Sequence, residues 1–422
     1  MELKNVAPDL AAHIEFAKTG NVVKIDNPLG PRVGAVFNLL QSRYILLGGS
    51  TGSGKTAFAD FLTVLGPFDF IKGLESQYDD KYANTPEEEK PPRLHWEVNY
   101  FSLERKQMFK KAKWISWFIK MEHDIKISAD RILGWADKPL TPELYTLVNS
   151  YGELLKELLE HVEIFDGKVS IDTLRKVIQQ RARELGVFYY TNDEGLFVDD
   201  NPMPLLTFKK DGVVTNSKRG KVVTLHYTHN GQEFALKPFG HKYFLNNPRT
   251  IVQFVIDGIG LFGGSDFSKK KSSIDEVSEL LAEARDNFGF ACLVVNQFNR
   301  AIGDTQRQRQ HGNNLSPQLE DFEGSSRTSH DADLVLAVFD PYRYKSYDGK
   351  GMYGDYSITQ GMMSPEGFCR FRSLHVLKNS FGIDGKKFGM LFIGESNHFD
   401  ILPLLDSPEL NNIYSKIAQN TI

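Results

Sequence analysis

Cysteine is scarce in this sequence. Among 422 residues only Cys292 and Cys369 occur, far apart and each inside an apolar run that is typical of a strand. Free cysteine packs as a small hydrophobic side chain, so we expect both thiols to be buried and reduced. The chain therefore offers no cysteine-based metal site.

Long apolar runs and a strong excess of one charge are also missing. No stretch approaches the roughly 20 apolar residues that a helix needs to cross a bilayer, and residues 1–16 include acidic side chains and no long apolar block. We therefore expect no secretory signal and a cytoplasmic location. The net charge of -4 argues against a wholly basic surface but is compatible with local basic stripes.

The pattern that is present alternates strands with helices. Apolar runs predict strands at 44–47, 97–102, 250–256, 290–295, 333–339, 373–377 and 387–393. Helical periodicity predicts helices at 56–65, 105–123, 171–184 and 274–284, whereas the polar segment 66–92 is expected to be an exposed loop. This order is typical of an α/β fold with a mainly parallel central sheet and helices on both faces.

A different composition interrupts this order. Residues 188–249 are rich in Gly, Asn, Asp and β-forming side chains. Within them, Asn230-Gly231 separates the alternating runs 221–227 and 232–237, which is a strong signal for a hairpin. We therefore expect a β-rich insertion in the core.

One motif carries specific chemistry. A phosphate-binding loop of the pattern G-x-x-x-x-G-K-[ST] stands between a predicted strand and a predicted helix, with the residues Gly49, Ser50, Thr51, Gly52, Ser53, Gly54, Lys55 and Thr56. Such a loop turns backbone N–H groups toward phosphate, and the helix N-terminus adds favourable dipole charge. Lys55 would neutralise the β- and γ-phosphates of ATP, and the Thr56 hydroxyl would bind Mg²⁺. We therefore expect a nucleoside triphosphatase with a RecA-like P-loop core.

Three polar residues follow other predicted strands. Asp257 suits the carboxylate that holds Mg²⁺ through water, with a strand-end cap as the alternative. Glu104 suits a general base for the attacking water, but glutamate is also common in the first turn of a helix. Gln297 suits a sensor of the γ-phosphate or an ordinary surface amide. The residues alone leave both interpretations open for each position.

These motifs, in this order, resemble the ATPase domain of DnaB-type replicative helicases. The resemblance spans most of residues 26–400 and rests on GSTGSGKTAF from Gly49, YFSLE from Tyr100, FVIDGIGLF from Phe254, LVVNQFNRAI from Leu293 and LEDFEGSSRTSHDADLVLAVF from Leu319. It implies an enzyme that uses ATP and Mg²⁺ and works on single-stranded DNA as a ring, expected to be a hexamer. A primase or a helicase loader is a further partner that the resemblance suggests.

The resemblance also assigns roles to residues. It makes Glu104 the general base, Asp257 the metal carboxylate and Gln297 a sensor at the base of a DNA-binding loop. It matches Lys378, in HVLKNSFG, to a lysine that reaches the phosphate held by a neighbouring subunit. The family's trans-acting arginine is replaced here by Ser380, and such a finger carries several orders of magnitude in rate. Substitutes are expected on the predicted edge strand, with Arg370 and Arg372 as candidates.

A second departure concerns DNA contact. Where the family has an Arg-Glu-Ser-Gly run, this chain has Glu323-Gly324-Ser325-Ser326, and an acidic residue facing phosphate is unfavourable. Contact then passes to other basic residues, namely Lys269, Lys270 and Lys271 in a predicted loop and Arg300, Arg307, Arg309 and Arg327. A solvated role is an equal interpretation for all of them.

The expected domains follow from where the core begins. We expect a linker helix within residues 1–25 and the ATPase core over residues 26–422, without the family's N-terminal primase-interacting domain. Compact additions such as residues 188–249 are typical of viral and mobile-element variants of the family, which suggests a phage origin and a location in the cytoplasm of the host. We interpret the chain as an ATP-driven helicase. The alternatives are a RecA- or KaiC-like ATPase without unwinding and a module that binds nucleotide but hydrolyses it poorly.

Overall fold

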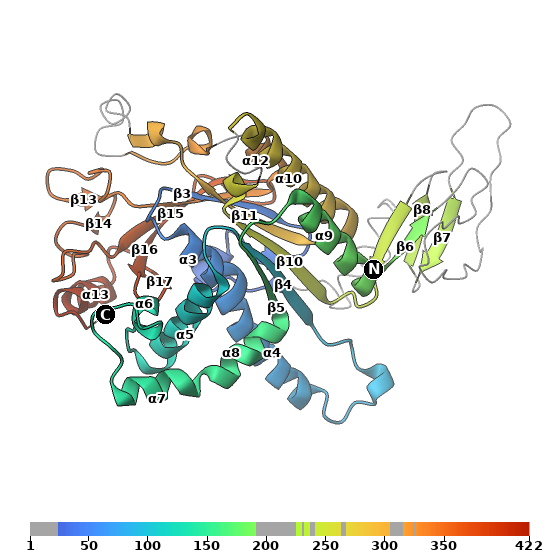
Figure 1. Ribbon diagram of the computed structural model, residues 1–422, viewed down its shortest axis with the longest axis horizontal. Helices are drawn as coiled ribbons and strands as arrows, with labels where there is room; N and C mark the ends of the chain where they lie inside the picture. The colour runs from blue at the N-terminus through green and yellow to red at the C-terminus, as the bar shows by residue number, and fades with distance from the viewer. Residues whose placement is uncertain are drawn as a thin grey trace. The chain divides into compact units, whose positions relative to one another are not determined.

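The computed structural model describes residues 24–190, 225–229, 232–236, 241–262, 267–303, 315–323 and 326–421 (Figure 1). The chain divides into two compact units. The larger comprises residues 24–85, 96–175 and 251–422, and the smaller includes residues 86–95 and 176–250. None of the helices in these described ranges has the length and apolar character needed to cross a membrane.

The larger unit is built on a nine-stranded sheet. From one edge to the other the strands are β17 (His398–Ile401), β16 (Lys387–Ile393), β15 (Phe371–Asn379), β12 (Leu334–Phe339), β3 (Tyr44–Gly49), β11 (Ala291–Gln297), β10 (Thr250–Asp257), β4 (His95–Ser102) and β5 (Val162–Asp166). Parallel pairing joins β12, β3, β11 and β10 in turn, and also joins β4 to β5. Strands β15, β16 and β17 continue the sheet in antiparallel pairing.

The central strands are apolar because both faces of the sheet are covered. Every residue of β3, β10 and β12 is buried, which is the pattern of a parallel sheet between helical layers. Helices α3, α4 and α5 lie on one face, and α10 and α12 lie on the other (Figure 1). The predicted α/β, RecA-like architecture is confirmed.

The helices follow the sequence pattern with two corrections. Their bounds are α2 (Pro31–Gly34), α3 (Lys55–Asp60), α4 (Gly66–Lys81), α5 (Gln107–His123), α6 (Ala129–Ile132), α7 (Pro142–Ser150), α8 (Gly152–His161), α9 (Ile171–Leu185), α10 (Phe267–Phe288), α12 (Ser326–Asp331) and α13 (Pro408–Ala418). Four short strands lie outside the main sheet in the larger unit, namely β1 (Lys24–Ile25), β2 (Leu39–Leu40), β13 (Met352–Tyr353) and β14 (Tyr356–Ser357).

The first correction concerns the predicted loop at 66–92. A π-helical turn, Phe61–Leu65, joins α3 to α4 without a break, and the Gly66 N–H donates to the Phe61 carbonyl. Proline lacks an N–H and normally ends a helix. Here Pro67 falls in the first turn after the wide π turn, where the missing donor costs no regular α-helical bond. The helix therefore continues to Lys81.

The second correction concerns the predicted loop at Lys269–Lys271. Helix α10 begins at Phe267, so the three lysines lie in its first turns. The apolar residues from Ile274 onward mark only the face that packs on the sheet. Lysine is itself a good helix former, and the helix extends beyond that apolar face.

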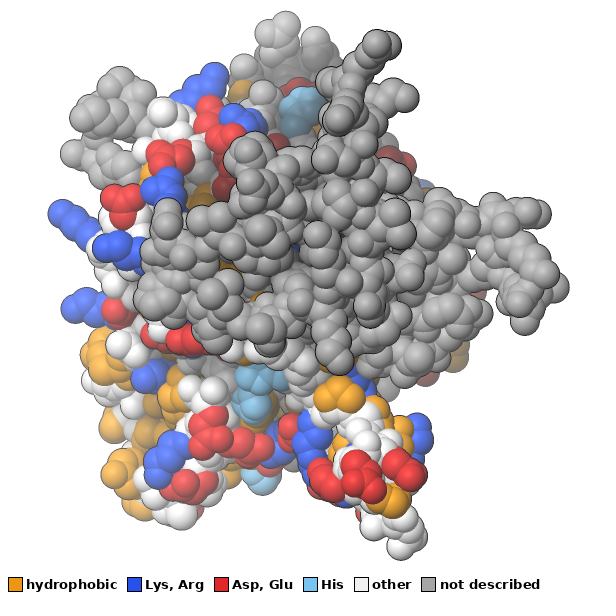
Figure 2. All heavy atoms as spheres, turned by 90° about the vertical axis from the view of Figure 1, so that its right-hand side faces the viewer, with side chains coloured by type: hydrophobic (Ala, Val, Ile, Leu, Met, Phe, Trp, Pro, Cys, Tyr) orange, Lys and Arg blue, Asp and Glu red, His pale blue; other side chains and the backbone are white. Residues whose placement is uncertain are grey.

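The smaller unit contains two antiparallel strand pairs. Strand β6 (Gly186–Tyr190) pairs with β9 (His241–Leu245), and β7 (Leu225–His229) pairs with β8 (Gln232–Leu236). His229 lies opposite Gln232, so the predicted hairpin is confirmed. On the face shown in Figure 2, described acidic and basic side chains are interspersed.

Candidate nucleotide site

The phosphate loop joins β3 to α3 and requires its glycines. Gly52 and Gly54 have φ values of +78° and +93°, the left-handed region that other residues rarely adopt. A Cβ on Gly49 would lie 2.5 Å from Ser53 Oγ and 2.9 Å from the Val338 carbonyl oxygen. The backbone can therefore form this tight cradle only with glycine at these positions.

The interior of the loop is polar and incompletely paired. Lys55 is only 6% exposed, and burial lowers the pKa of its ammonium, opposed by the nearby carboxylates of Glu104 and Asp257. The hydroxyls of Ser50 and Ser53 are buried and have no hydrogen-bond partner within the described part of the chain. Buried polar groups are normally paired, so these hydroxyls and the Lys55 ammonium fit an anionic ligand such as phosphate.

Thr56 and Asp257 meet at the end of β10. The Thr56 hydroxyl donates to Asp257 Oδ1 at 3.0 Å. Burial raises the pKa of the Asp257 carboxyl, and Lys110 lowers it. The described residues contain no group of three or more His, Cys, Asp and Glu side chains that could hold a metal. This oxygen pair suits Mg²⁺, which takes one or two protein ligands and completes its shell with water and phosphate.

A buried lysine that the sequence analysis missed contacts the same carboxylate. Lys110 Nζ donates to Asp60 Oδ1 at 2.9 Å and to Asp257 Oδ2 at 3.5 Å, and it lies 3.9 Å from the centre of the Tyr100 ring. The signal was its position on the buried stripe of α5, four residues before Trp114. A lysine on such a stripe is buried only when carboxylates pair with it.

Glu104 and Gln297 contact each other next to the phosphate loop. Gln297 Nε2 donates to Glu104 Oε1 at 3.3 Å, and the Thr51 hydroxyl approaches Gln297 Oε1 at 3.5 Å. Gly258 has a φ of +101°, and a Cβ there would lie 2.9 Å from Glu104 Cγ. Three residues from separate strand ends thus form one chain of polar contacts that reaches the phosphate loop.

Comparison with known proteins identifies the fold that carries this site. No protein family and no curated protein matches the chain in sequence. Among solved structures, the ATPase domain of a helicase aligns with 95% of this chain and 100% of its own, at 14% identity and a TM-score of 0.51. A DnaB-like replicative helicase, solved in a study of its interactions with primase, aligns with 95% of this chain and 69% of its own, at 14% identity and a TM-score of 0.52. The chain has the fold of a DnaB-type helicase ATPase domain.

A third similarity is more distant. A KaiC-like protein from Pyrococcus horikoshii aligns with 90% of this chain and 100% of its own at 12% identity, with a TM-score of 0.39. That score is too low to guide interpretation. At 14% identity the two helicase structures establish the DnaB-type fold and leave the activity to the residues of the site.

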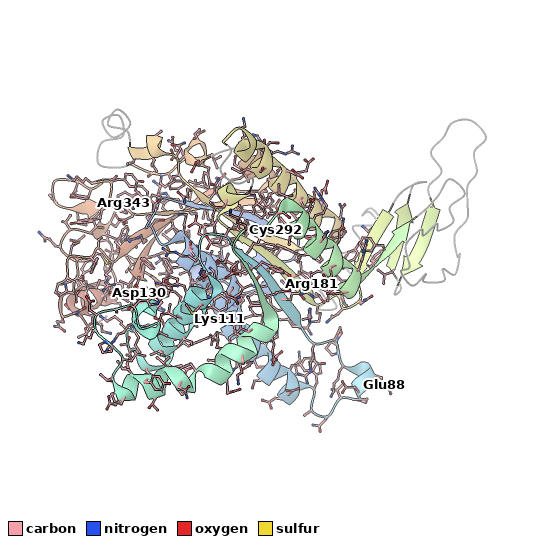
Figure 3. All side chains as sticks on the ribbon, viewed as in Figure 1. Glu88, Lys111, Asp130, Arg181, Cys292 and Arg343 are labelled. Atoms are coloured by element: carbon pink, nitrogen blue, oxygen red, sulfur yellow. The ribbon has the colours of Figure 1, made fainter. Side chains whose placement is uncertain are left out.

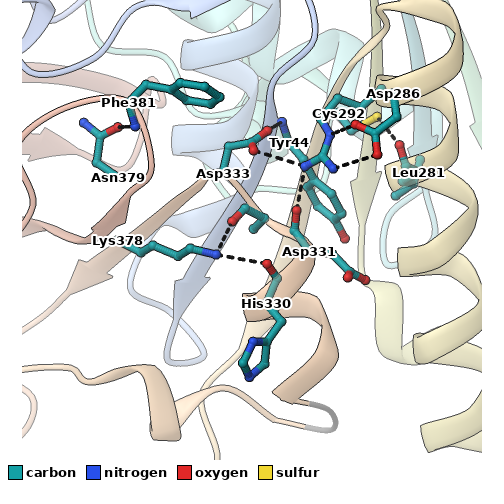
Figure 4. Close-up of polar contacts among 12 residues, drawn as sticks. Tyr44, Leu281, Asp286, Cys292, His330, Asp331, Asp333, Lys378, Asn379 and Phe381 are labelled. Atoms are coloured by element: carbon teal, nitrogen blue, oxygen red, sulfur yellow. Dashed lines mark hydrogen bonds and ion pairs between the residues drawn. The ribbon is translucent and has the colours of Figure 1, made fainter.

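Within this DnaB-type fold Lys378 is engaged by its own chain (Figure 4). Its ammonium donates to the carbonyl oxygens of Ser329, His330 and Ala332 at 3.0, 3.0 and 2.6 Å. These carbonyls belong to the C-terminal end of α12, where helices leave acceptors unpaired. All three N–H donors of Lys378 are used there, so a role in a neighbouring subunit's site would require their release.

Arg370 and Arg372 are not free either, which corrects the expectation for a substitute finger. Strand β15 lies inside the sheet rather than at its edge. Arg370 is 4% exposed and forms a bidentate ion pair with Glu395. Arg372 is 7% exposed, donates to the Ser53 carbonyl at 2.9 Å and pairs with Asp340 at 3.2 Å. Both guanidinium groups are therefore bound within their own chain, and Arg372 also holds the phosphate loop through the Ser53 carbonyl.

A different arginine, which the sequence analysis missed, reaches the phosphate loop of this DnaB-type fold. Arg343 follows β12 on a loop (Figure 3), is exposed, and donates from Nη1 to the Thr51 carbonyl. No motif marks it, because its position depends on the fold of the turn after β12.

The predicted DNA contacts are only partly within the described residues. Arg307 and Arg309 lie outside them, and Arg300 begins the short helix Arg300–Gly303. Lys271 is exposed. Arg327 is 46% exposed and forms ion pairs with Glu279 at 3.1 Å and Asp331 at 3.6 Å. Contact with DNA stays a prediction for these side chains.

Proposed function

We propose that the protein hydrolyses ATP and uses the energy to move along single-stranded DNA as a helicase. The chain of contacts from Thr51 through Gln297 to Glu104 carries the proposal. A carboxylate placed beside a phosphate loop can orient and deprotonate a water molecule. The amide that touches both groups can report whether the γ-phosphate is present.

Each residue has a defined task in this proposal. Lys55 and the unpaired hydroxyls of Ser50 and Ser53 bind the phosphates, and Glu104 accepts the proton of the attacking water. Thr56 and Asp257 would hold Mg²⁺, which neutralises charge on the β- and γ-phosphates when bound. These roles match what each side chain can donate or accept in the geometry described above.

The nucleoside has a place beside the loop. A hollow of about 520 Å³ is lined by Tyr342, Phe368 and Phe392 among other residues. Phe392 adjoins the loop, since a Cβ on Gly54 would lie 3.0 Å from its ring. The Phe392 ring already stacks on Phe399 and lies under Arg372, whereas the Phe368 ring is exposed. An exposed aromatic ring suits the flat face of a base, so we assign the base to this hollow.

The proposal includes a ring of subunits, most simply a hexamer, with single-stranded DNA as substrate track and a primase or loader as partner. The fold similarity supports the class of protein, and the DNA-binding residues remain those predicted from sequence. One observation favours a second function, a module that binds nucleotide and hydrolyses it poorly. It is the engagement of Lys378 within its own chain, which leaves the shared site without that cation.

Three measurements on purified protein test the proposal. The wild type should bind a fluorescent ATP analogue with Mg²⁺, hydrolyse ATP faster when single-stranded DNA is added, and unwind a forked duplex. Lys55→Ala should lose binding and hydrolysis, because it removes the charge that faces the β- and γ-phosphates. Lys350→Ala, an exposed lysine far along the β12–β13 loop, is the matched control. Binding without hydrolysis in the wild type would select the second function.

A further inference from the structure

We propose that Arg343 is a catalytic residue that acts within its own chain, touching the γ-phosphate and stabilising the charge that develops there during hydrolysis. The inference rests on the proposed ATPase function. It assigns to a residue of the same chain the task that an arginine finger from a neighbour performs in other nucleotide hydrolases.

The position of the guanidinium carries the inference. Arg343 Nη1 donates to the Thr51 carbonyl, and a Cβ on Gly52 would lie 3.1 Å from the same nitrogen. Thr51 and Gly52 form the outer turn of the phosphate loop, before the segment that leads into α3. Gln297 approaches the same turn from the opposite strand end. Arg343, which follows β12, and the chain of contacts to Glu104, which arrives from β11, therefore meet at the same turn of the loop.

The turn that carries Arg343 is fixed to the loop. Asp340 accepts a hydrogen bond from the Arg343 N–H at 3.2 Å through Oδ1, and its Oδ2 pairs with Arg372 at 3.2 Å. Arg372 in turn donates to the Ser53 carbonyl. Tyr344 stacks on Phe339 with ring centres 5.4 Å apart. The backbone under Arg343 is thus held, while its exposed side chain keeps donors available for a ligand.

The local charge also points to an anion. Arg343 adds to the burial that lowers the pKa of the Lys55 ammonium, and it acts in the same direction on Arg372. Glu104 and Asp257 act in the opposite direction on Lys55, and Asp340 does so on Arg372, but a further negative group beside Arg343 would reduce the repulsion among these cations. Arg343 itself has no carboxylate partner among the described residues. A γ-phosphate in the loop would satisfy both cations.

Arg343 takes no part in proton transfer during the proposed hydrolysis. The water oxygen forms a bond to the γ-phosphorus, and the bond from that phosphorus to the β–γ bridging oxygen breaks with its electron pair left on ADP. The proton of the water passes to Glu104, and the products are ADP and inorganic phosphate. The Arg343 guanidinium donates hydrogen bonds to the γ-phosphate oxygens and to the bridging oxygen as their charge grows.

Arg343→Ala tests the inference, with Lys350→Ala as control. We expect kcat to fall by about 10³-fold or more, binding of a non-hydrolysable analogue to change only a few-fold, and trapping of ADP with aluminium fluoride to be lost. Because Arg343 is exposed, its removal should leave the melting temperature unchanged. Arg343→Lys should recover only part of the rate, since an ammonium cannot donate in two directions in one plane.

Other outcomes overturn the inference or its premise separately. If the wild type has no ATPase activity, the proposed function itself is wrong. With an active wild type, normal kcat in Arg343→Ala overturns the catalytic role, and so does an equal loss of analogue binding and kcat. Mixing Arg343→Ala with Lys55→Ala subunits should restore no activity, because both residues belong to one chain's site. Recovery on mixing would show that Arg343 acts across subunits and would overturn the assignment within the chain.

Discussion

The two halves of the central sheet use charged side chains in opposite ways. At the carboxyl ends of the parallel strands, Glu104 accepts from the Gln297 amide, and the buried hydroxyls of Ser50 and Ser53 have no partner among the described residues. In the antiparallel half, Arg370, Arg372 and Lys378 are all bound by groups of the same chain. The parallel half leaves its polar groups available to a ligand, whereas the antiparallel half uses them for structure.

The contrast shows that the type of a side chain does not by itself determine its role. A lysine or arginine next to a helicase-like motif suggests a functional cation, but its role depends on which acceptors surround it. Three carbonyl oxygens surround Lys378, whereas one carbonyl contacts Arg343. Substitutions in the two halves should therefore give different phenotypes, with loss of rate in the first and loss of stability in the second.

Among the substitutions that test this contrast, the largest effect is expected at Glu104. Glu104→Gln should lower kcat by about 10²–10⁴-fold, because the amide cannot accept the water's proton. Binding of ATP should persist, since the substitution keeps the shape and the contact with Gln297. Single-turnover hydrolysis and analogue binding are the measurements, with Glu160→Gln on the exposed face of α8 as control. Wild-type turnover in Glu104→Gln would require another base.

Lys110 is an exception to this contrast. It lies next to the candidate site of the parallel half, but its buried ammonium pairs with Asp60 and Asp257 and stabilises the fold. Lys110→Met should lower the free energy of unfolding by about 3–5 kcal/mol, since Asp60 and Asp257 lose the cation they share. Urea unfolding measures this loss. Adding Asp60→Asn to Lys110→Met should recover part of the stability by removing one uncompensated carboxylate. Equal stability of the single variant and the wild type would contradict the pairing.

Lys378 should show the opposite phenotype to Glu104. Lys378→Met should lower the free energy of unfolding by about 1–3 kcal/mol, because carbonyls at the end of α12 lose a charged donor. The ATPase rate of the folded protein should change little. Mixing Lys55→Ala with Lys378→Met subunits distinguishes this structural role from a role of Lys378 in a neighbouring subunit's nucleotide site. Inactivity of Lys378→Met alone, with activity regained in the mixture, would favour that role over the structural one.

The smallest effect is expected in the β-rich insertion. Replacing residues 225–236 with a short Gly/Ser linker removes β7 and β8 and leaves β6 paired with β9. Loop-closure entropy changes slowly with length, so the melting temperature and the DNA-stimulated ATPase rate should stay at the wild-type values. A folded variant that fails to bind nucleotide would show that this hairpin supports the core.

The sequence predicted the features that short-range patterns encode. The phosphate loop needs glycines at fixed spacing, and the buried strands need continuous apolar runs, so both were found where the structure has them. The residues alone left the roles of Asp257, Glu104 and Gln297 open, and only the resemblance assigned them; their placement together follows from neighbouring parallel strands that end at one edge of the sheet. Their mutual contacts follow from the strand order.

The features that it did not predict depend on partners distant in sequence. Lys110 is 147 residues from Asp257, and Arg343 is 292 residues from Thr51. No local rule connects such pairs. The engagement of Arg370 and Lys378 was missed for the same reason, since their acceptors lie on other loops and helices. Helix α4 was missed because its segment is polar and contains proline, and because the π turn before it leaves no signature in composition.

That π turn has a consequence for tracing the ancestry of the chain. A wide turn places one additional residue in the helix without opening a loop, so every later side chain is rotated by about 100° relative to an uninterrupted helix. A relative without the turn would bury its residues at positions offset by one from Phe68 and Ile71 of α4. Aligned residue by residue, the two helices would show apolar positions opposite polar ones throughout this segment. Superposing the two backbones would reveal the relationship, whereas aligning the two sequences would not.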